Sequence, residues 1–132
     1  MPGTELYALI YVEDVDLVAD WVVDNLGFVD NWRAPGETGV TEHAELLWGT
    51  TRVSINVKAS HGDVYSPSSV AVSVPDREAV DRIHAHIAGR LDGVPAPEES
   101  RIAYGFTVLD PVDNEWWVHA ETGFLDEFRK IK

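Results

Sequence analysis

The sequence contains no cysteine. Its absence excludes disulfide bonds, thiol catalysis and metal sites built on thiolates, and it fits a cytoplasmic location. Basic residues are also scarce, with 10 Lys and Arg against 23 Asp and Glu and a formal net charge of −13. A field of that sign repels phosphate backbones, so we expect no nucleic-acid partner. It would attract a cationic ligand, although the simplest role of such charge is solubility.

Long apolar runs are missing as well. No stretch approaches the 18 residues of a membrane-spanning helix, so we expect no contact with a membrane. The first residues have neither a basic start nor an apolar core, so we expect no signal peptide and place the protein in the cytoplasm. What is present is a globular composition, with 132 residues of which 45% are hydrophobic. That length predicts a single domain with a core of its own.

The most informative feature is an internal repeat. When the sequence is shifted by 62 residues, structurally meaningful positions coincide, namely Val12 with Val74, Asp14 with Asp76, Val18 with Val80, and Gly27 with Gly89. Each half then has the same order, in which a strand ends, an Asp caps a helix of about twelve residues, and a Gly stops it. The spacing of apolar residues completes a βαβββ order in both halves.

We therefore predict an α+β fold of two tandem βαβββ modules. Module 1 covers about residues 5–58, a polar linker 59–67, module 2 about 68–121, and a tail with a short helix 122–132. In module 1, strands are expected at 6–12, 28–33, 40–48 and 52–58. In module 2, they are expected at 70–74, within 92–100, at 104–109 and at 115–120. One module cannot bury its own sheet face. Side by side, the two should form one curved mixed sheet with the helices outside and a concave face free for a ligand.

Several motifs carry a family resemblance. They are the run Tyr11–Asp16 with the following Asn25–Phe28, the run His43–Leu46, and the late run Tyr104–Trp117, in which Asp113 stands where an Asp-Pro-x-Gly-Asn motif has Gly. Together with the repeat, they resemble the vicinal oxygen chelate superfamily, which includes glyoxalases, bleomycin-resistance proteins and extradiol dioxygenases. The resemblance covers nearly the whole chain and implies the same two-module fold.

The resemblance also implies where a metal would lie, because this superfamily usually places its ligands on the first and last strand of each module. The matching positions are Tyr7, Ser69, Trp117 and one residue of 54–56, and none of these is His, Asp or Glu. A divalent metal of this class needs at least three such ligands. We therefore expect no metal and no other cofactor. A displaced site made by His43, His119 and a Glu is the alternative.

Strand alternation predicts which side chains face the cleft. In the first strand of each module, alternate Val and Ile residues should face the helices, which leaves the residues between them on the other side. The candidate ligand-binding residues are Tyr7, Tyr11, Arg52, Ser54, Asn56, Ser69, Glu115, Trp117 and His119. This is an aromatic surface with a few polar groups, the usual character of a small-molecule site.

Each main candidate also has a purely structural interpretation. Trp117 could belong to the core. His119 could be a general base, or a polar wall residue with no nucleophile beside it. Arg52 could pair an anionic group or simply flank a turn, and Glu115 could be solvated. No catalytic residue is assigned.

Three functional hypotheses follow. The first is a metal-free protein that sequesters a small aromatic or cationic molecule, as bleomycin-resistance proteins do in antibiotic resistance. The resemblance then implies a homodimer whose groove lies between subunits. The second is a lyase or isomerase that uses His119 and Glu115, or a relocated metal. The third is a chain with only a partner-protein role.

Overall fold

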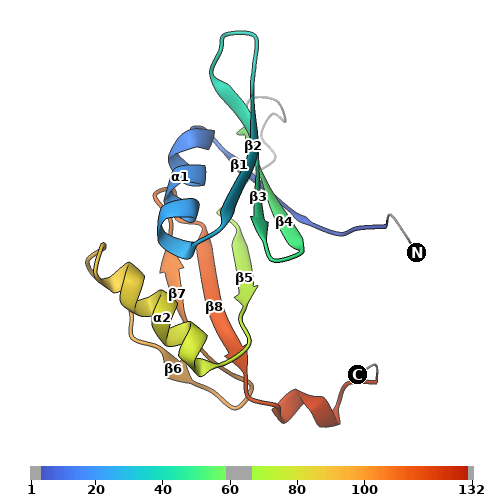
Figure 1. Cartoon of the computed structure of the whole chain (residues 1–132), viewed down its shortest axis with the longest axis vertical. Coiled ribbons are helices and arrows are strands. Elements are labelled where there is room, and N and C mark those ends of the chain that lie inside the picture. Colours follow the sequence, from blue (N-terminus) through green and yellow to red (C-terminus); the bar gives the residue numbers. More distant parts are fainter. Residues whose placement is uncertain (1–3, 59–66, 131–132) are drawn as a thin grey trace. The chain divides into compact units, whose positions relative to one another are not determined.

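The computed structural model describes residues 4–58 and 67–130, and its elements follow the predicted order (Figure 1). The predicted linker, 59–67, therefore lies almost entirely outside the described residues. The chain divides into two compact units. The first runs to Ser68 and includes the turn Asp110–Asn114, and the second comprises Ser69–Leu109 and the chain from Glu115 onward.

Module 1 is a four-stranded mixed sheet with one helix. Its elements are β1 (Ala8–Val12), α1 (Val15–Leu26), β2 (Val29–Pro35), β3 (Thr41–Trp48) and β4 (Thr51–Val57). The strand order is β1-β4-β3-β2. Strands β1 and β4 are parallel, whereas β4, β3 and β2 are antiparallel neighbours.

Module 2 repeats this arrangement. Its elements are β5 (Ser69–Ser73), α2 (Arg77–Ala88), β6 (Glu98–Glu99), β7 (Ala103–Leu109) and β8 (Glu115–Glu121), in the order β5-β8-β7-β6. Strand β6 has only two residues and lies within the predicted range 92–100, a segment with two prolines, which disfavour strands. The tail adds a single 3-10 turn, η2 (Phe124–Glu127).

The α+β class and the two βαβββ modules are confirmed, but the sheet differs from the prediction. Hydrogen bonds form two separate four-stranded sheets and not one continuous sheet, and among the described residues no strand pair joins them. Within each module the first strand pairs in parallel with the last, so all the pairing stays within the module.

The helix caps explain why the repeat was visible in the sequence. Asp14 Oδ1 accepts a hydrogen bond from the amide of Leu17 at 3.1 Å, and Asp76 Oδ1 accepts one from Ala79 at 2.9 Å. Gly27 ends α1 in the left-handed region with φ 83°. Gly89 follows α2 with φ −75°, so this helix ends without the left-handed glycine that the repeat suggested.

Each helix covers one face of its own sheet. Helix α1 buries Val18 and Val22 against β3 and β4, where Leu46 and Ile55 are fully buried. Helix α2 packs its Val80 and Ile87 on β7 and β8, which contribute buried residues such as Phe106, Trp116 and Val118. The opposite face of each sheet, its open face, carries the candidate site residues. No helix among the described residues has the length and apolarity needed to cross a bilayer.

Candidate ligand-binding site

Trp117 is the central side chain on the open face of the module 2 sheet. It follows Trp116, which is fully buried under α2, and strand alternation turns Trp117 to the other side, where it is partly exposed. Its ring is stacked on that of His119, with centroids 3.9 Å apart and planes inclined by 13°. The indole is therefore backed by a second ring and held in one orientation.

The register of the neighbouring strands fixes what surrounds this ring pair. Trp117 is opposite Ala71 on β5 and Thr107 on β7, and His119 is opposite Gly105. A Cβ added to Gly105 would lie 2.2 Å from the carbonyl oxygen of Val118 and 2.8 Å from Cβ of His119. No residue with a side chain fits at this position, so glycine is required for β7 to lie this close to β8.

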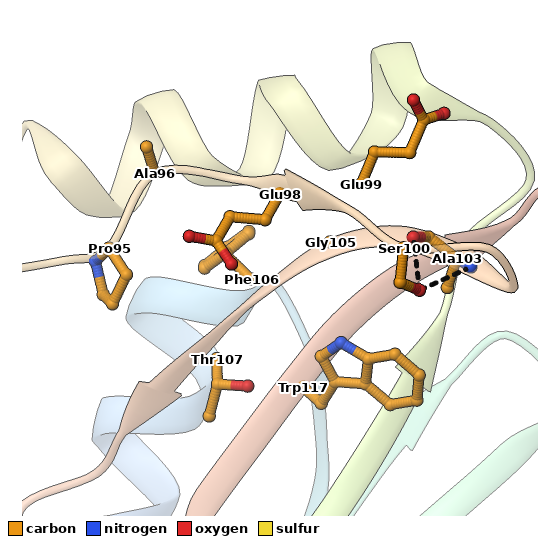
Figure 2. A pocket seen from close by; sticks show the side chains of 10 residues that line it. All are labelled: Pro95, Ala96, Glu98, Glu99, Ser100, Ala103, Gly105, Phe106, Thr107 and Trp117. Atoms are coloured by element: carbon orange, nitrogen blue, oxygen red, sulfur yellow. Dashed lines mark hydrogen bonds between the residues drawn. The ribbon is translucent and has the colours of Figure 1, made fainter.

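Two cavities adjoin Trp117. The first, of about 390 Å³, lies towards the edge of the sheet (Figure 2), and its lining residues are Pro95, Ala96, Glu98, Glu99, Ser100, Ala103, Gly105, Phe106, Thr107 and Trp117. The second, of about 370 Å³, lies towards β5, and its lining residues are Ser69, Val70, Ala71, Thr107, Glu115 and Trp117. In the second cavity the hydroxyl of Ser69 donates to Glu115 at 2.9 Å. Trp117 and Thr107 belong to both linings, so the indole separates the two hollows.

His119 is held as a neutral imidazole. Only 8% of its surface is exposed, and its buried Nδ1 has no hydrogen-bond partner among the described residues. Burial lowers the pKa of His119, and the nearby Glu121 only partly opposes this effect. At neutral pH the open face of module 2 therefore presents an uncharged ring pair.

The open face of the module 1 sheet is organised around a buried carboxylate. Glu45 on β3 is 6% exposed and accepts hydrogen bonds from Arg52 and, at 2.6 Å, from Nδ2 of Asn31. These bonds hold the pKa of Glu45 below its usual range, although burial acts in the opposite direction. Glu45 therefore remains ionised.

The guanidinium of Arg52 is engaged in contacts with other residues of the chain. In addition to its hydrogen bond to Glu45, Arg52 donates from Nε to Glu5 at 2.6 Å. The Arg52 guanidinium also lies 3.8 Å from the centre of the Tyr7 ring. The sequence offered Arg52 as a possible partner for an anionic ligand. In the structure its charge is already matched by two carboxylates, and its stacking on Tyr7 keeps that ring in place.

The other module 1 candidates form a small polar chain. Ser54 donates to Oδ1 of Asn56 at 3.2 Å, and Nδ1 of His43 lies 2.9 Å from the same oxygen. Tyr11 lines a separate cavity of about 250 Å³ together with Lys58 and other residues. These contacts lie within the first unit, and the idea that Tyr7 and Trp117 face one common cleft stays a prediction.

Sequence reasoning missed three residues that the structure brings to the open faces: Glu45, Glu98 and Thr107. Thr107 could have been found, because it alternates with the buried Phe106 and Val108. Glu45 lies in a similar alternation with Ala44 and Leu46. Glu98 could not have been found from the sequence, because its face is set by a two-residue pairing with β7 that no local pattern reveals.

The positions that match the superfamily's metal ligands do not fit a divalent metal. Tyr7 lies under a guanidinium, the hydroxyl of Ser69 is bonded to Glu115, and Trp117 offers no lone pair. Within residues 4–58 and 67–130, no three His, Asp or Glu side chains are grouped so that they could hold a metal ion. His43, considered for a displaced site, is engaged by Asn56.

Solved structures of known proteins share this fold. A lactoylglutathione lyase from Agrobacterium tumefaciens superposes with a TM-score of 0.73 at 15% identity, covering 91% of this chain and 95% of its own. TioX from Micromonospora sp. ML1 gives 0.74 at 23% identity, with coverages of 89% and 98%. A glyoxylase/bleomycin resistance protein/dioxygenase domain from Frankia sp. EAN1pec gives 0.71 at 16% identity, with coverages of 98% and 99%.

No protein-family model matches the sequence, and no curated protein matches it either. The structural likenesses, at such low identity, establish the fold alone. The chain has the vicinal oxygen chelate fold, as its repeat and motifs predicted.

Proposed function

We propose that this protein binds a small planar organic molecule on the open face of the module 2 sheet, by stacking on Trp117. The observation that carries the proposal is a partly exposed indole, backed by His119 and bordered by cavities of about 390 and 370 Å³. Cavities of this size suit drug-sized ligands, and a rigid aromatic wall with a few polar groups is typical of such sites.

Sequestration accounts for these residues better than catalysis does. The two groups considered for acid–base chemistry, His119 and Glu115, are four residues apart on one strand, which separates them by about 13 Å. Trp117 stands between them. Glu115 is bonded to Ser69, and within the described residues no carboxylate hydrogen-bonds to Nδ1 of His119 to orient it as a base. The acidic charge of the chain favours a cationic ligand, and an antibiotic-like molecule fits this description.

An enzyme of the lyase or isomerase type is the second candidate. One observation favours it, because the lowered pKa of His119 keeps the free base present at neutral pH. The purified protein can be assayed for formation and cleavage of S-lactoylglutathione with and without added divalent metal. Turnover that disappears in His119→Gln, with the fold intact, would favour this candidate over sequestration.

The stacking proposal is tested by ligand titration followed by tryptophan fluorescence. Suitable probes are acridine and N-methylacridinium, which share one planar shape but differ in charge. Trp117→Ala should weaken binding of both by about 1–3 kcal/mol, whereas Trp117→Phe should retain much of it. If Trp117→Ala lowers the melting temperature by several degrees and leaves binding unchanged, Trp117 is a core residue and the proposal is wrong.

We also propose that the protein forms a homodimer. The open face of the module 1 sheet exposes 48% of Leu9 and 45% of Trp32, and a second copy would remove this apolar surface from water. Light scattering at micromolar concentration should give twice the chain mass. A monomer of 14.6 kDa would contradict the homodimer proposal, and each ligand site would then be formed by one chain alone.

A further inference from the structure

We infer that Glu98, on the edge strand β6, makes the site selective for cations by contacting the positive group of a ligand stacked on Trp117. The inference rests on the proposed function and adds to it a residue that senses charge. It concerns the first cavity, of about 390 Å³, which Glu98 and Trp117 line together.

The strand register places Glu98 on the correct face. Glu98 pairs with Gly105, and Gly105 pairs with His119 on the next strand. Side chains of directly paired residues in antiparallel strands point to the same side, so Glu98 shares the open face with His119 and Trp117. Figure 2 shows the carboxylate of Glu98 on the Trp117 side of β6, with Glu99 pointing away from that ring.

Glu98 also differs from the neighbouring carboxylates in being free to bind. In the described part of the chain its carboxylate has no ion pair and no hydrogen bond within the protein. Glu99 forms an ion pair with Arg77, whose guanidinium also lies 4.7 Å from the centre of the Tyr104 ring. Glu115, on the far side of Trp117, accepts the hydroxyl of Ser69. Of the two acidic residues that line the first cavity, only Glu98 therefore has its full charge available.

The turn between β6 and β7 holds Glu98 in position. The amide of Ser100 donates to the carbonyl of Ala103 at 2.8 Å, and the Ser100 hydroxyl donates to the same carbonyl at 3.1 Å. The amide of Ala103 returns a bond to that hydroxyl at 3.2 Å. Three bonds thus close a short turn, which fixes the course of the backbone of the two-residue strand beside the cavity (Figure 2).

These features select a particular class of ligand. A planar cation would make two favourable interactions at this site, because its charge is attracted to the indole face and also to the carboxylate of Glu98. A neutral molecule of the same shape gains only the stacking. The net charge of −13 brings cations to the surface, but a general field cannot distinguish one glutamate from the next.

The experiment compares Glu98→Gln with Glu99→Gln, using N-methylacridinium and acridine under mildly alkaline conditions, where acridine is uncharged. Both variants remove one negative charge from adjacent positions, so any change in the general field is the same for both. Glu98→Gln should weaken N-methylacridinium binding by roughly three- to tenfold and leave acridine unchanged. Glu99→Gln should change neither. The difference between the variants should shrink in high salt.

Each other result has a definite meaning. If Trp117→Ala weakens both probes and Glu98→Gln weakens neither, the inference about Glu98 is overturned while the stacking proposal stands. If Glu98→Gln and Glu99→Gln weaken the cation equally, the effect is general and Glu98 has no special role. If neither probe binds the unmodified protein, both proposals are overturned. Thermal unfolding of each variant shows that the fold is retained.

Discussion

The indole of Trp117 lies nearly parallel to the imidazole of His119, with ring centroids 3.9 Å apart. The two residues are separated by one position on β8, so the stack follows from strand alternation and not from any distant contact. A titratable group therefore lies directly against the aromatic surface that we propose for ligand binding. This arrangement links the stability of the open face to pH.

The first prediction concerns that link. Burial lowers the pKa of His119 from its ordinary value of 6.5, so the unfolded chain binds this proton more readily than the folded one. The contribution of the neutral His119 imidazole to the free energy of unfolding is thus complete above pH 6.5. It is lost as the pH falls from there towards the pKa of His119 in the folded protein. Chemical denaturation between neutral and mildly acidic pH should show stability falling more steeply in the unmodified protein than in His119→Gln.

Equal slopes in the unmodified protein and His119→Gln would show that the imidazole is not desolvated in solution.

The second prediction concerns the close approach of β7 and β8. Gly105→Ala places a methyl group 2.2 Å from a backbone oxygen that cannot move without breaking the ladder. We expect a loss of about 1–3 kcal/mol or more in the free energy of unfolding, measured by urea denaturation. Gly89→Ala is the matched control, because its φ is −75° and the nearest atom to its new Cβ is 3.4 Å away. Equal stability of the two variants would mean that the strands separate more easily than the structure indicates.

The third prediction concerns the turn between β7 and β8. Among the described residues, Asp113 is the only non-glycine residue with positive φ, at 68°. The left-handed region costs an L-residue about 1–2 kcal/mol, which is why Gly suits this position of the turn. Asp113→Gly should therefore change the free energy of unfolding by no more than about 1 kcal/mol, whereas Asp113→Val should lower it by about 1–2 kcal/mol. A Val variant as stable as the Gly variant would contradict the strained conformation.

The fourth prediction concerns the buried carboxylate of module 1. Arg52→Gln leaves Glu45 buried with fewer donors, so the melting temperature should fall. Adding Glu45→Gln should restore part of the loss, because the buried charge is then removed as well. Thermal unfolding of both single variants and the double variant measures the coupling. Strictly additive effects would show that the pair contributes nothing in solution.

Local patterns predicted most of the fold. Asp14 and Asp76 marked the helix starts because a capping carboxylate acts on amides only three residues away. The alternation of Val and Ile assigned β1 and β5 to the correct faces, since side-chain direction in a strand has a period of two. The same rule assigned Trp117 to the side of the strand away from the helix.

The contacts of the candidate site residues could not be predicted from the sequence, because they join residues distant in the sequence. Arg52 looked available for a ligand, and only folding brings Glu5, 47 residues away, to its guanidinium. The edge position of Glu98 depends on hydrogen bonds to β7, and a two-residue strand is too short to leave a pattern in the sequence.

The sequence by itself therefore determined the two βαβββ modules, the helix caps, and the buried and open faces. These features depend on the chemistry of single residues and on periodicities of two and 3.6, which act over a few neighbours. Only the tertiary structure decided that the strands close into two sheets, that Arg52 is already paired, and that Glu98 stands free beside Trp117. Those outcomes depend on which strands pair and in which register, and pairing is set by packing across the whole module.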